Sequence, residues 1–350
     1  MSKLDILSYN LDGLEEIILE MGESKFRAKQ IFRWLHIDRV DTFDEMTNIS
    51  KELREKLDEK FEIKQLEIHK RLISEIDGTR KYLFKLEDGQ IIESVMMPYK
   101  HGKTVCVSSQ AGCRMGCKFC ASTLNGLDRN LTVSEILGQS YAIEKDMGEK
   151  VTHIVLMGSG EPLDNFDNVM QYIRVISDDN GTNLSKRNIT LSTCGLVDGI
   201  KKLAEIGFPV TLALSLHAAD DETRKKIMPI ANKYTIAEEL DACWYLFEKT
   251  GRRVSFEYSL INGVNDSPED AVKLGKLVGG RNCHINLIPM NPVDERDLEQ
   301  STKERIEAFC SALEKYHINV TIRREMGRDI NGACGQLRNR ELENYEANGE

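Results

Sequence analysis

The sequence predicts an α/β protein in which a small N-terminal helical domain and a β-hairpin linker precede a partial, TIM-like (βα)6 barrel. Three patterns predict this order. Apolar residues recur at helical steps up to about residue 62, alternate with a period of two from 64 to 98, and then fall into alternating strand and helix segments after about residue 103. Strands that alternate with helices are typical of a parallel sheet with helical crossovers.

The first 63 residues are expected to form a helical accessory domain. Their apolar residues recur at three- and four-residue steps in three groups: Leu14, Ile17 and Ile18; Phe26, Ile31, Phe32 and Leu35; Leu53, Leu57 and Phe61. Such spacing is typical of amphipathic helices. Residues 64–102 follow as the β-hairpin linker, with turns predicted at Asp77-Gly78 and Asp88-Gly89.

The barrel is predicted over residues 103–325, and residues 326–350 form a C-terminal segment. Its expected strands are Thr104–Ser108, His153–Met157, Asn188–Ser192, Val210–Ser215, Val254–Leu260 and His284–Ile288. Its expected helices are Ser134–Met147, Asn165–Ser177, Val197–Ile206, Ala237–Lys249, Pro268–Val278 and Lys303–Tyr316. Six such units are too few for a closed eight-stranded barrel, which favours an open, curved barrel over a flat doubly wound sheet.

Polar residues and cysteines follow five of the six predicted strands. The run CRMGCKFC follows the first strand and Gly158–Pro162 the second, while Ser192 ends the third. Ser215–His217 closes the fourth strand, and Pro289–Pro292 closes the sixth. In βα barrels the loops at the carboxyl ends of the strands converge on one mouth and build the active site. The sequence therefore predicts a functional site at that edge.

Cys113, Cys117 and Cys120 form a CxxxCxxC motif in the run CRMGCKFC. Three thiolates are one short of the four ligands that complete an iron-sulfur cube or a structural zinc site, so one coordination position stays open for a substrate. A zinc site completed by His101 or His153 is the alternative, because thiolates also suit zinc. Zinc motifs usually pair CxxC with a second, distant pair, which this chain lacks.

The motif, with Phe119 directly before Cys120, resembles that of the radical S-adenosylmethionine (SAM) superfamily. The resemblance implies that the three cysteines hold a [4Fe-4S] cluster and that the amine and carboxylate of SAM chelate its fourth iron. The loop Gly158–Pro162 resembles the GEP loop of the superfamily, which implies that Gly160 and Glu161 contact the amino group of SAM. Further SAM contacts implied by the resemblance lie at later strand ends: Ser192, Ser215, Leu216, His217 and Asn291.

Near the C-terminus, small residues flank Cys334 and leave its sulfur accessible, while nearby arginines favour the nucleophilic thiolate. The stretch Ile322–Arg338, IRREMGRDINGACGQLR, closely resembles the C-terminal signature of the RlmN family, which are adenine-C2 methyltransferases of ribosomal and transfer RNA. Other stretches that resemble this family are IESV, CVSSQAGC, GSGEPLDN, LSTCG, SLHA, LINGVND and NLIPMNP. The related Cfr enzymes methylate C8 of adenosine in 23S rRNA and are the alternative, although Pro162 and NLIPMNP favour RlmN.

Carbon 2 of adenine is electron-poor and carries no acidic proton, so it cannot attack the methyl group of SAM. The RlmN resemblance implies a radical route with two SAM molecules, in which Cys334 first becomes S-methylcysteine. It also implies that Cys106 later forms a disulfide with Cys334 and that Glu93 accepts the C2 proton. The implied substrates are 23S rRNA and tRNA, the latter next to its anticodon, with flavodoxin or ferredoxin as the electron donor.

The composition is that of a reduced, soluble, cytoplasmic protein, expected to be a monomer without membrane association. The N-terminal run MSKLDILSYNLDGLEE carries acidic residues where a signal peptide would be apolar, and no apolar run reaches membrane-spanning length. Nine cysteines form no framework typical of secreted proteins. Four of them are interpreted as small core residues: Cys194, Cys243, Cys283 and Cys310.

The net charge of -10 argues against indiscriminate coating of nucleic acid, but two basic groups are candidate RNA contacts. Lys25, Lys29 and Arg33 share one helical face beside Trp34. The other group is Arg323, Arg324, Arg328, Arg338 and Arg340. Two further alternatives stay open: a radical SAM enzyme that modifies a peptide or small metabolite, and a zinc-stabilised RNA-binding protein without catalysis.

Overall fold

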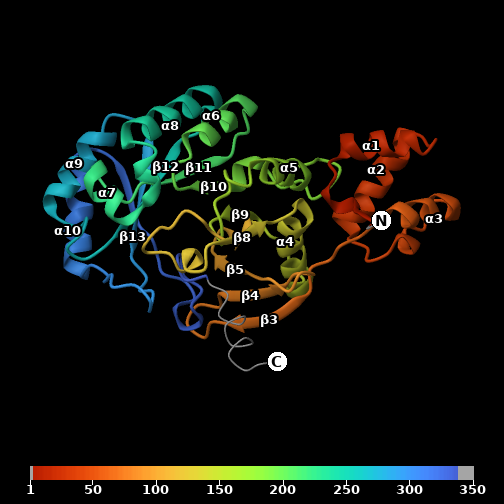
Figure 1. Ribbon diagram of the computed structural model, residues 1–350, viewed down its shortest axis with the longest axis horizontal. Coiled ribbons are helices and arrows are strands. Elements are labelled where there is room, and N and C mark those ends of the chain that lie inside the picture. Colours follow the sequence, from red (N-terminus) through yellow and green to blue (C-terminus); the bar gives the residue numbers. More distant parts are fainter. Residues whose placement is uncertain (1–2, 338–350) are drawn as a thin grey trace.

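The computed structural model describes residues 3–337 and has the predicted α/β architecture (Figure 1). The N-terminal helices, coloured red and orange, lie at one end of the elongated molecule, and α9 (Pro268–Val278) and α10 (Lys303–Glu314) lie at the other. The curved sheet runs between them, with helices on its outer side. The helices therefore do not cover the carboxyl ends of the parallel strands, where the loops that follow each strand lie.

The N-terminal domain is helical and is closed by a short parallel pair of strands, β1 and β2. Its elements are β1 (Leu4–Asp5), η1 (Ile6–Ser8), α1 (Leu11–Glu20), α2 (Lys25–Arg33), η2 (Trp34–Asp38), η3 (Phe43–Glu45), α3 (Lys51–Lys60) and β2 (Phe61–Glu62). Ser50 caps α3 by accepting a hydrogen bond from the Leu53 amide. Most of the predicted apolar repeat is buried, but Phe26 is 64% exposed on α2.

Within residues 3–337 the main sheet has ten strands, in the order β14-β13-β12-β11-β10-β9-β6-β5-β4-β3. The parallel strands are β6 (Gly102–Cys106), β9 (His153–Leu156), β10 (Ile189–Thr193), β11 (Thr211–Ser215), β12 (Val254–Leu260), β13 (Cys283–Pro289) and β14 (Asn319–Ile322). The first six of these are the predicted barrel strands; β12 has the predicted bounds, and the ends of the others differ from the prediction by at most two residues. β14 is a parallel strand that the six-unit prediction did not include.

The hairpin strands β3 (Ile68–Ile73), β4 (Arg80–Lys85) and β5 (Ile91–Tyr99) extend this sheet by antiparallel pairing, because β5 pairs with β6. The segment expected to be a linker is therefore part of the sheet of the barrel. Its two turns lie at the predicted Asp-Gly pairs, where Gly78 and Gly89 adopt φ of 75° and 86°.

Capping interactions of nearby residues determine where several of the helices begin and end. α4 (Val133–Met147) and α8 (Ile236–Thr250) start at capping boxes and end at left-handed glycines, Gly148 and Gly251. The other barrel helices are α5 (Phe166–Ile176), α6 (Val197–Ile206) and α7 (Asp221–Ile227), together with α9 and α10. Short elements complete the described chain: β7 (Gln110–Gly112), η4 (Ala121–Thr123), β8 (Leu127–Asn130), η5 (Lys186–Asn188), η6 (Pro229–Asn232) and η7 (Arg328–Ile330). None of the helices in residues 3–337 has the length and apolarity needed to span a bilayer.

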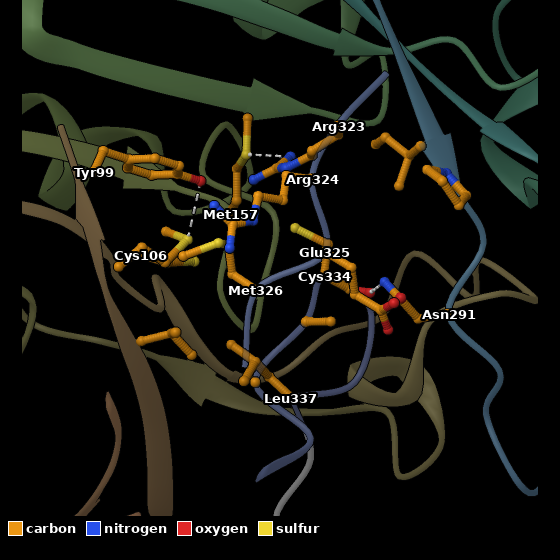
Figure 2. A pocket seen from close by; sticks show the side chains of 16 residues that line it. Tyr99, Cys106, Met157, Asn291, Arg323, Arg324, Glu325, Met326, Cys334 and Leu337 are labelled. Carbon is orange, nitrogen blue, oxygen red and sulfur yellow. Dashed lines mark hydrogen bonds between the residues drawn. The ribbon is translucent and has the colours of Figure 1, made fainter. Parts of the chain in front are cut away.

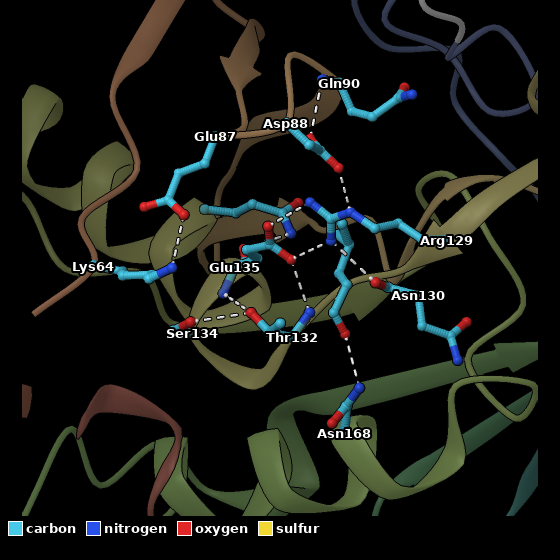
Figure 3. Close-up of polar contacts among 12 residues, drawn as sticks. Lys64, Glu87, Asp88, Gln90, Arg129, Asn130, Thr132, Ser134, Glu135 and Asn168 are labelled. Carbon is cyan, nitrogen blue, oxygen red and sulfur yellow. Dashed lines mark hydrogen bonds and ion pairs between the residues drawn. The ribbon is translucent and has the colours of Figure 1, made fainter. Parts of the chain in front are cut away.

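A polar network fastens the β4–β5 turn to the barrel (Figure 3). The Arg129 guanidinium donates to Asp88 in that turn at 2.5 Å and to both carboxylate oxygens of Glu135 in the first turn of α4 at 2.8 Å. On the other side of the turn, Lys64 donates to Glu87 at 2.7 Å. A bidentate pair between an arginine and a carboxylate fixes the direction of the interaction as well as its distance. Arg129 therefore holds the β4–β5 turn at a fixed position relative to α4.

Candidate active site

A cavity of about 910 Å³ opens at the carboxyl ends of the parallel strands. Most of the candidate site residues from the sequence line it: Cys113, Cys117, Cys120, Gly160, Glu161, Ser192, Ser215, His217, Asn291 and Cys334. We call it the strand-end cavity. Among the predicted SAM contacts Leu216 is the exception, since its side chain is fully buried in the core and is not part of the lining. Any contact of Leu216 with a ligand here would be through its main chain.

The cysteine loop follows β7 and is held by the Thr123 side chain and by a hydrogen bond to α7. Thr123 donates from its hydroxyl to the carbonyls of Cys117 and Cys120, and the Lys118 amide donates to Ile227 at 2.9 Å. Burial raises the pKa of Cys113 to about 12 and also raises that of Cys117. Buried thiols give up their protons readily to a bound metal, because its positive charge replaces the missing solvation. Three such donors fit an iron-sulfur cluster with one open corner.

The zinc site considered as an alternative is not formed. His101 and His153 lie at the amino ends of β6 and β9, whereas the cysteine loop follows the opposite, carboxyl end of β6. The His101 ring instead stacks on Tyr99, and the His153 ring packs edge-on against His101 at 5.0 Å. Across residues 3–337, no three His, Cys, Asp or Glu side chains converge on a position for a single metal ion.

Glu161 is fixed by backbone amides. Its two carboxylate oxygens accept hydrogen bonds from the amides of Leu163 at 3.1 Å and Cys194 at 2.8 Å, and burial raises its pKa. Gly160 precedes it with φ of 104°, and a Cβ there would lie 2.7 Å from the Gln110 amide nitrogen. Only glycine fits this close approach, so the loop presents a preset carboxylate to the cavity.

His217 is held as a neutral ring. Burial lowers its pKa to about 3, and its Nδ1 accepts a hydrogen bond from the Ser259 amide at 2.9 Å, which leaves the ring proton on Nε2. The residue has φ of 54°, in the left-handed region that non-glycine residues seldom adopt. Phe119 of the cysteine loop packs edge-on against this ring at 4.7 Å. His217 therefore joins the end of β11 to the cysteine loop and offers one hydrogen-bond donor.

A second cavity adjoins the first and contains both Cys106 and Cys334 (Figure 2). We call it the two-cysteine chamber. Arg323, Asn291 and Met157 line both cavities, as does Cys334. Cys334 therefore lies at the boundary between the strand-end cavity and the chamber that holds Cys106.

Arg323 points into this chamber rather than toward solvent (Figure 2). Its side chain is 18% exposed, lies 3.6 Å from the buried carboxylate of Glu257, and donates to the Met157 sulfur at 3.6 Å. Its charge opposes the effect of burial, which raises the pKa of Cys106 to about 12. Arg323 directly follows β14, so this strand, which was not predicted, places the guanidinium group in the chamber.

The basic residues predicted to contact RNA differ in their exposure to solvent. Arg324 and Arg328 are exposed, unlike Arg323, and Arg338 and Arg340 lie outside the described residues. In the N-terminal domain, the side chains of Lys25, Lys29 and Arg33 are exposed on α2. The exposed Phe26 ring belongs to the same helix.

Glu93 is buried, contrary to the solvated position usual for carboxylates on hairpins. Its carboxylate oxygen lies 2.9 Å from the ammonium of Lys81, which is also buried. All nine cysteines are free thiols, so the disulfide expected between Cys106 and Cys334 is absent from this state of the protein. Cys310 is only partly buried, which corrects its interpretation as a core residue.

Several residues of the site were not singled out from the sequence. Gln110 bonds the Glu161 amide and Asp164, and Glu257 lines the strand-end cavity. Arg224 is fully buried and donates to the carbonyls of Cys194 and Leu216. Arg224 lies in the charged run DETRKK, and charged residues in such a helix are usually exposed. The sequence therefore does not indicate that Arg224 is buried.

Comparison with known proteins covers nearly the whole chain. The family model for the ribosomal RNA large subunit methyltransferase N-terminal domain matches residues 4–63, and the model for the radical SAM superfamily matches residues 107–275. A protein of Lachnoclostridium phytofermentans named probable dual-specificity RNA methyltransferase RlmN is 56% identical over 96% of this chain and 94% of its own length. One of the same name from Lachnospira eligens is 57% identical over 98% of both.

A solved structure resembles the fold throughout. The crystal structure of a radical SAM methyltransferase from Sphaerobacter thermophilus has a TM-score of 0.90 and 41% identity, and the match covers 96% of this chain and 99% of that one. The likeness therefore includes the N-terminal domain, the hairpin strands and the barrel together.

Proposed function

Because the chain belongs to the RlmN family of radical SAM RNA methyltransferases, we propose that it methylates carbon 2 of an adenosine in 23S rRNA and in tRNA, with Cys334 as the methyl carrier. One observation carries the proposal. Cys334 lines both the strand-end cavity, with the three clustered cysteines, and the chamber that contains Cys106. A sulfur at that boundary has access to SAM on one side and to a second cysteine on the other.

The residues of the strand-end cavity fit the two cofactors. Cys113, Cys117 and Cys120 would hold a [4Fe-4S] cluster, and Glu161 offers a fixed carboxylate to the ammonium group of SAM. The reduced cluster would supply the electron that cleaves SAM into methionine and a 5′-deoxyadenosyl radical. The neutral ring of His217 and the hydroxyls of Ser192 and Ser215 supply hydrogen bonds to the ribose or carboxylate of the bound molecule.

Cys334 takes part first as a nucleophile. Its thiolate would attack the methyl carbon of one SAM molecule and take the methyl group, so that S-adenosylhomocysteine leaves, and Arg323 provides positive charge in the same chamber. The S-methyl group would then lose a hydrogen atom to the 5′-deoxyadenosyl radical, and its carbon would bond to C2 of adenine. Glu93 would accept the proton from C2. The bond between the Cys334 sulfur and the methylene carbon would break as the Cys106 sulfur bonds to that of Cys334, the methylene carbon would take up the proton of the Cys106 thiol, and the one electron left over would return to the oxidised cluster.

The substrate base must leave its helical stack to reach Cys334, because C2 is not accessible to a side chain inside a duplex. A single-stranded loop or an extruded nucleotide is therefore the expected substrate. The exposed basic face of α2, with Phe26 beside Lys25 and Lys29, suits contacts with RNA phosphates and an unstacked base.

The test is mass spectrometry of adenosines from 23S rRNA and tRNA incubated, without oxygen, with reduced protein and SAM labelled in its methyl group. The expected product is 2-methyladenosine carrying the label. Label at C8 would indicate the Cfr reaction, and label in no nucleoside would reject RNA methylation.

A further inference from the structure

Lys81 is a buried lysine on the hairpin that carries Glu93. It is 6% exposed, which is rare for lysine because an ammonium group is costly to remove from water unless it is paired. Its Nζ lies 2.9 Å from the carboxylate of Glu93 and donates to the main-chain carbonyl of Asn331 at 3.3 Å. One ammonium group therefore joins β4 to Glu93 and to the loop that leads to Cys334.

The register of the hairpin places this pair beside the two-cysteine chamber. Lys81 is opposite Val95 in the β4–β5 ladder, and Val95 is opposite Cys106 in the β5–β6 ladder. Because alternate residues of a strand share a face, Glu93 lies on the same face of β5 as Val95. Val95 lines the chamber with Cys106 and Cys334.

Glu93 lines a third cavity next to that chamber, and Leu337 lines both. Asp128, which is exposed, is the other charged side chain in the lining of this third cavity. A buried carboxylate holds its proton more tightly than it would in water, whereas an ammonium group at hydrogen-bond distance opposes that effect. Lys81, at 2.9 Å, therefore supplies a positive charge that favours the carboxylate form of Glu93.

We propose that Lys81 is a positioning residue that holds Glu93 as a carboxylate, at a fixed place relative to the Cys334 loop, for removal of the C2 proton. The inference rests on the proposed function. In the step concerned, the C2–H bond of the protein-linked adenine breaks, its proton bonds to a Glu93 oxygen, and its electron pair stays on the base. Lys81 keeps its three protons throughout and contacts no reacting atom.

The test compares Lys81→Met, which removes the charge, with Lys81→Arg, which keeps it. Lys85→Met is the matched control, because Lys85 is exposed on the same strand. General bases contribute about 100-fold or more to such steps, so Lys81→Met should lower the rate of C2 methylation at least about tenfold at neutral pH. The acid limb of its pH profile should move to higher pH, because no ammonium group then favours the charged form of Glu93. Lys81→Arg should restore most of the rate.

Two further readouts separate this role from a structural one. Methylation of Cys334 precedes proton removal, so its extent, measured by peptide mass spectrometry, should equal that of Lys85→Met. With RNA deuterated at C2 of the target adenosine, the isotope effect on product formation should increase in Lys81→Met, because proton removal limits the rate. Lys81→Gln replaces the Met variant if that variant does not fold.

Equal rates, pH profiles and isotope effects in Lys81→Met and Lys85→Met would overturn the proposal. Loss of Cys334 methylation in Lys81→Met would overturn it as well, because Lys81 would then act only by holding the loop. The variant Glu93→Gln distinguishes a failure of the proposed function from a failure of the proposed role of Lys81. If it leaves C2 methylation intact, Glu93 is not the base and the proposed function is revised at that point. If Glu93→Gln stops methylation and Lys81→Met does not, only the role of Lys81 is rejected.

Discussion

The side-chain amide of Asn291 donates a 2.9 Å hydrogen bond to the main-chain carbonyl of Cys334. A loop between β13 and α10 thus restrains the loop that carries the proposed methyl acceptor. Asn291→Ala should loosen it, because a hydrogen bond of this kind contributes about 0.5–1.5 kcal/mol. Amide hydrogen exchange of the peptide containing Cys334, measured without SAM, should become about two- to tenfold faster.

The matched control for Asn291 is Asn262→Ala, since Asn262 is exposed and bonds Glu299 at the surface. Equal exchange of the Cys334 peptide in both variants would show that Asn291 does not hold this loop. Because the measurement needs no SAM, it is independent of any contact between Asn291 and the adenine of SAM.

Cys334→Ser should abolish RNA methylation, because a serine hydroxyl is not ionised at neutral pH and cannot take the methyl group as a thiolate does. The change keeps nearly the same shape, so iron content and thermal unfolding should match the unsubstituted protein. Cys310→Ser, at a partly exposed position on α10, should keep full activity. Methylated RNA from Cys334→Ser would remove Cys334 from the mechanism.

Cys106 should react with alkylating agents only at alkaline pH. Burial raises its pKa to about 12, so the thiol is protonated at neutral pH and its thiolate fraction grows about tenfold with each pH unit below that value. The alkylation rate of Cys106 in the unsubstituted protein, followed by mass spectrometry of the peptide that contains it, should therefore increase through pH 8 to about 10 without a plateau. A plateau below about pH 9 would contradict the buried, protonated state.

The main features of the barrel site were predictable from the sequence, because its residues follow strands directly along the chain. Gly160, Ser192 and Ser215 lie at strand ends wherever the strands are correctly placed, and the parallel order brings those ends together. β14 was missed because Asn319–Ile322 is short and mostly exposed, so it has no apolar alternation. Its place in the sheet depends on pairing with β13, which the local sequence does not encode.

Side-chain contacts between neighbouring strands could not be predicted from the sequence either. Lys81 and Glu93 are twelve positions apart and meet only because of the antiparallel register of β4 and β5. Periodicity alone assigned Phe26 to an apolar repeat, but α2 buries the face that carries Ala28, Ile31 and Phe32 and leaves the Phe26 ring exposed. In both cases the deciding information is the arrangement of elements in space, which propensity and spacing do not contain.

Arg224 should be critical for stability. It is fully buried, lies 2.5 Å from Glu239, and donates to carbonyls at the ends of β10 and β11, including that of Ser215. Arg224→Met leaves Glu239 as an uncompensated buried charge and should cost about 3–5 kcal/mol in the free energy of unfolding, measured by urea denaturation. Lys225→Met, one residue along on the exposed side of α7, should change it by less than about 0.5 kcal/mol. Similar losses in both variants would refute a special role for the buried pair.

The basic face of α2 should contribute to RNA affinity through phosphate contacts. Replacing Lys25, Lys29 and Arg33 with alanine removes three exposed charges, so binding of an RNA hairpin should weaken and depend less on salt. For single-stranded segments, the slope of log affinity against log salt concentration should fall in magnitude by about 2. Fluorescence anisotropy at several salt concentrations measures both quantities.

The control for this triple variant removes the same charge from another helix of the same domain: Lys51, Lys56 and Lys60 on α3. Long-range attraction depends on net charge and would weaken equally in both triple variants, whereas direct phosphate contacts depend on position. A larger loss of affinity and slope for the α2 variant therefore identifies α2 as the contact. Equal effects would reject it and leave the exposed side chains of Arg324 and Arg328 as the remaining described candidates.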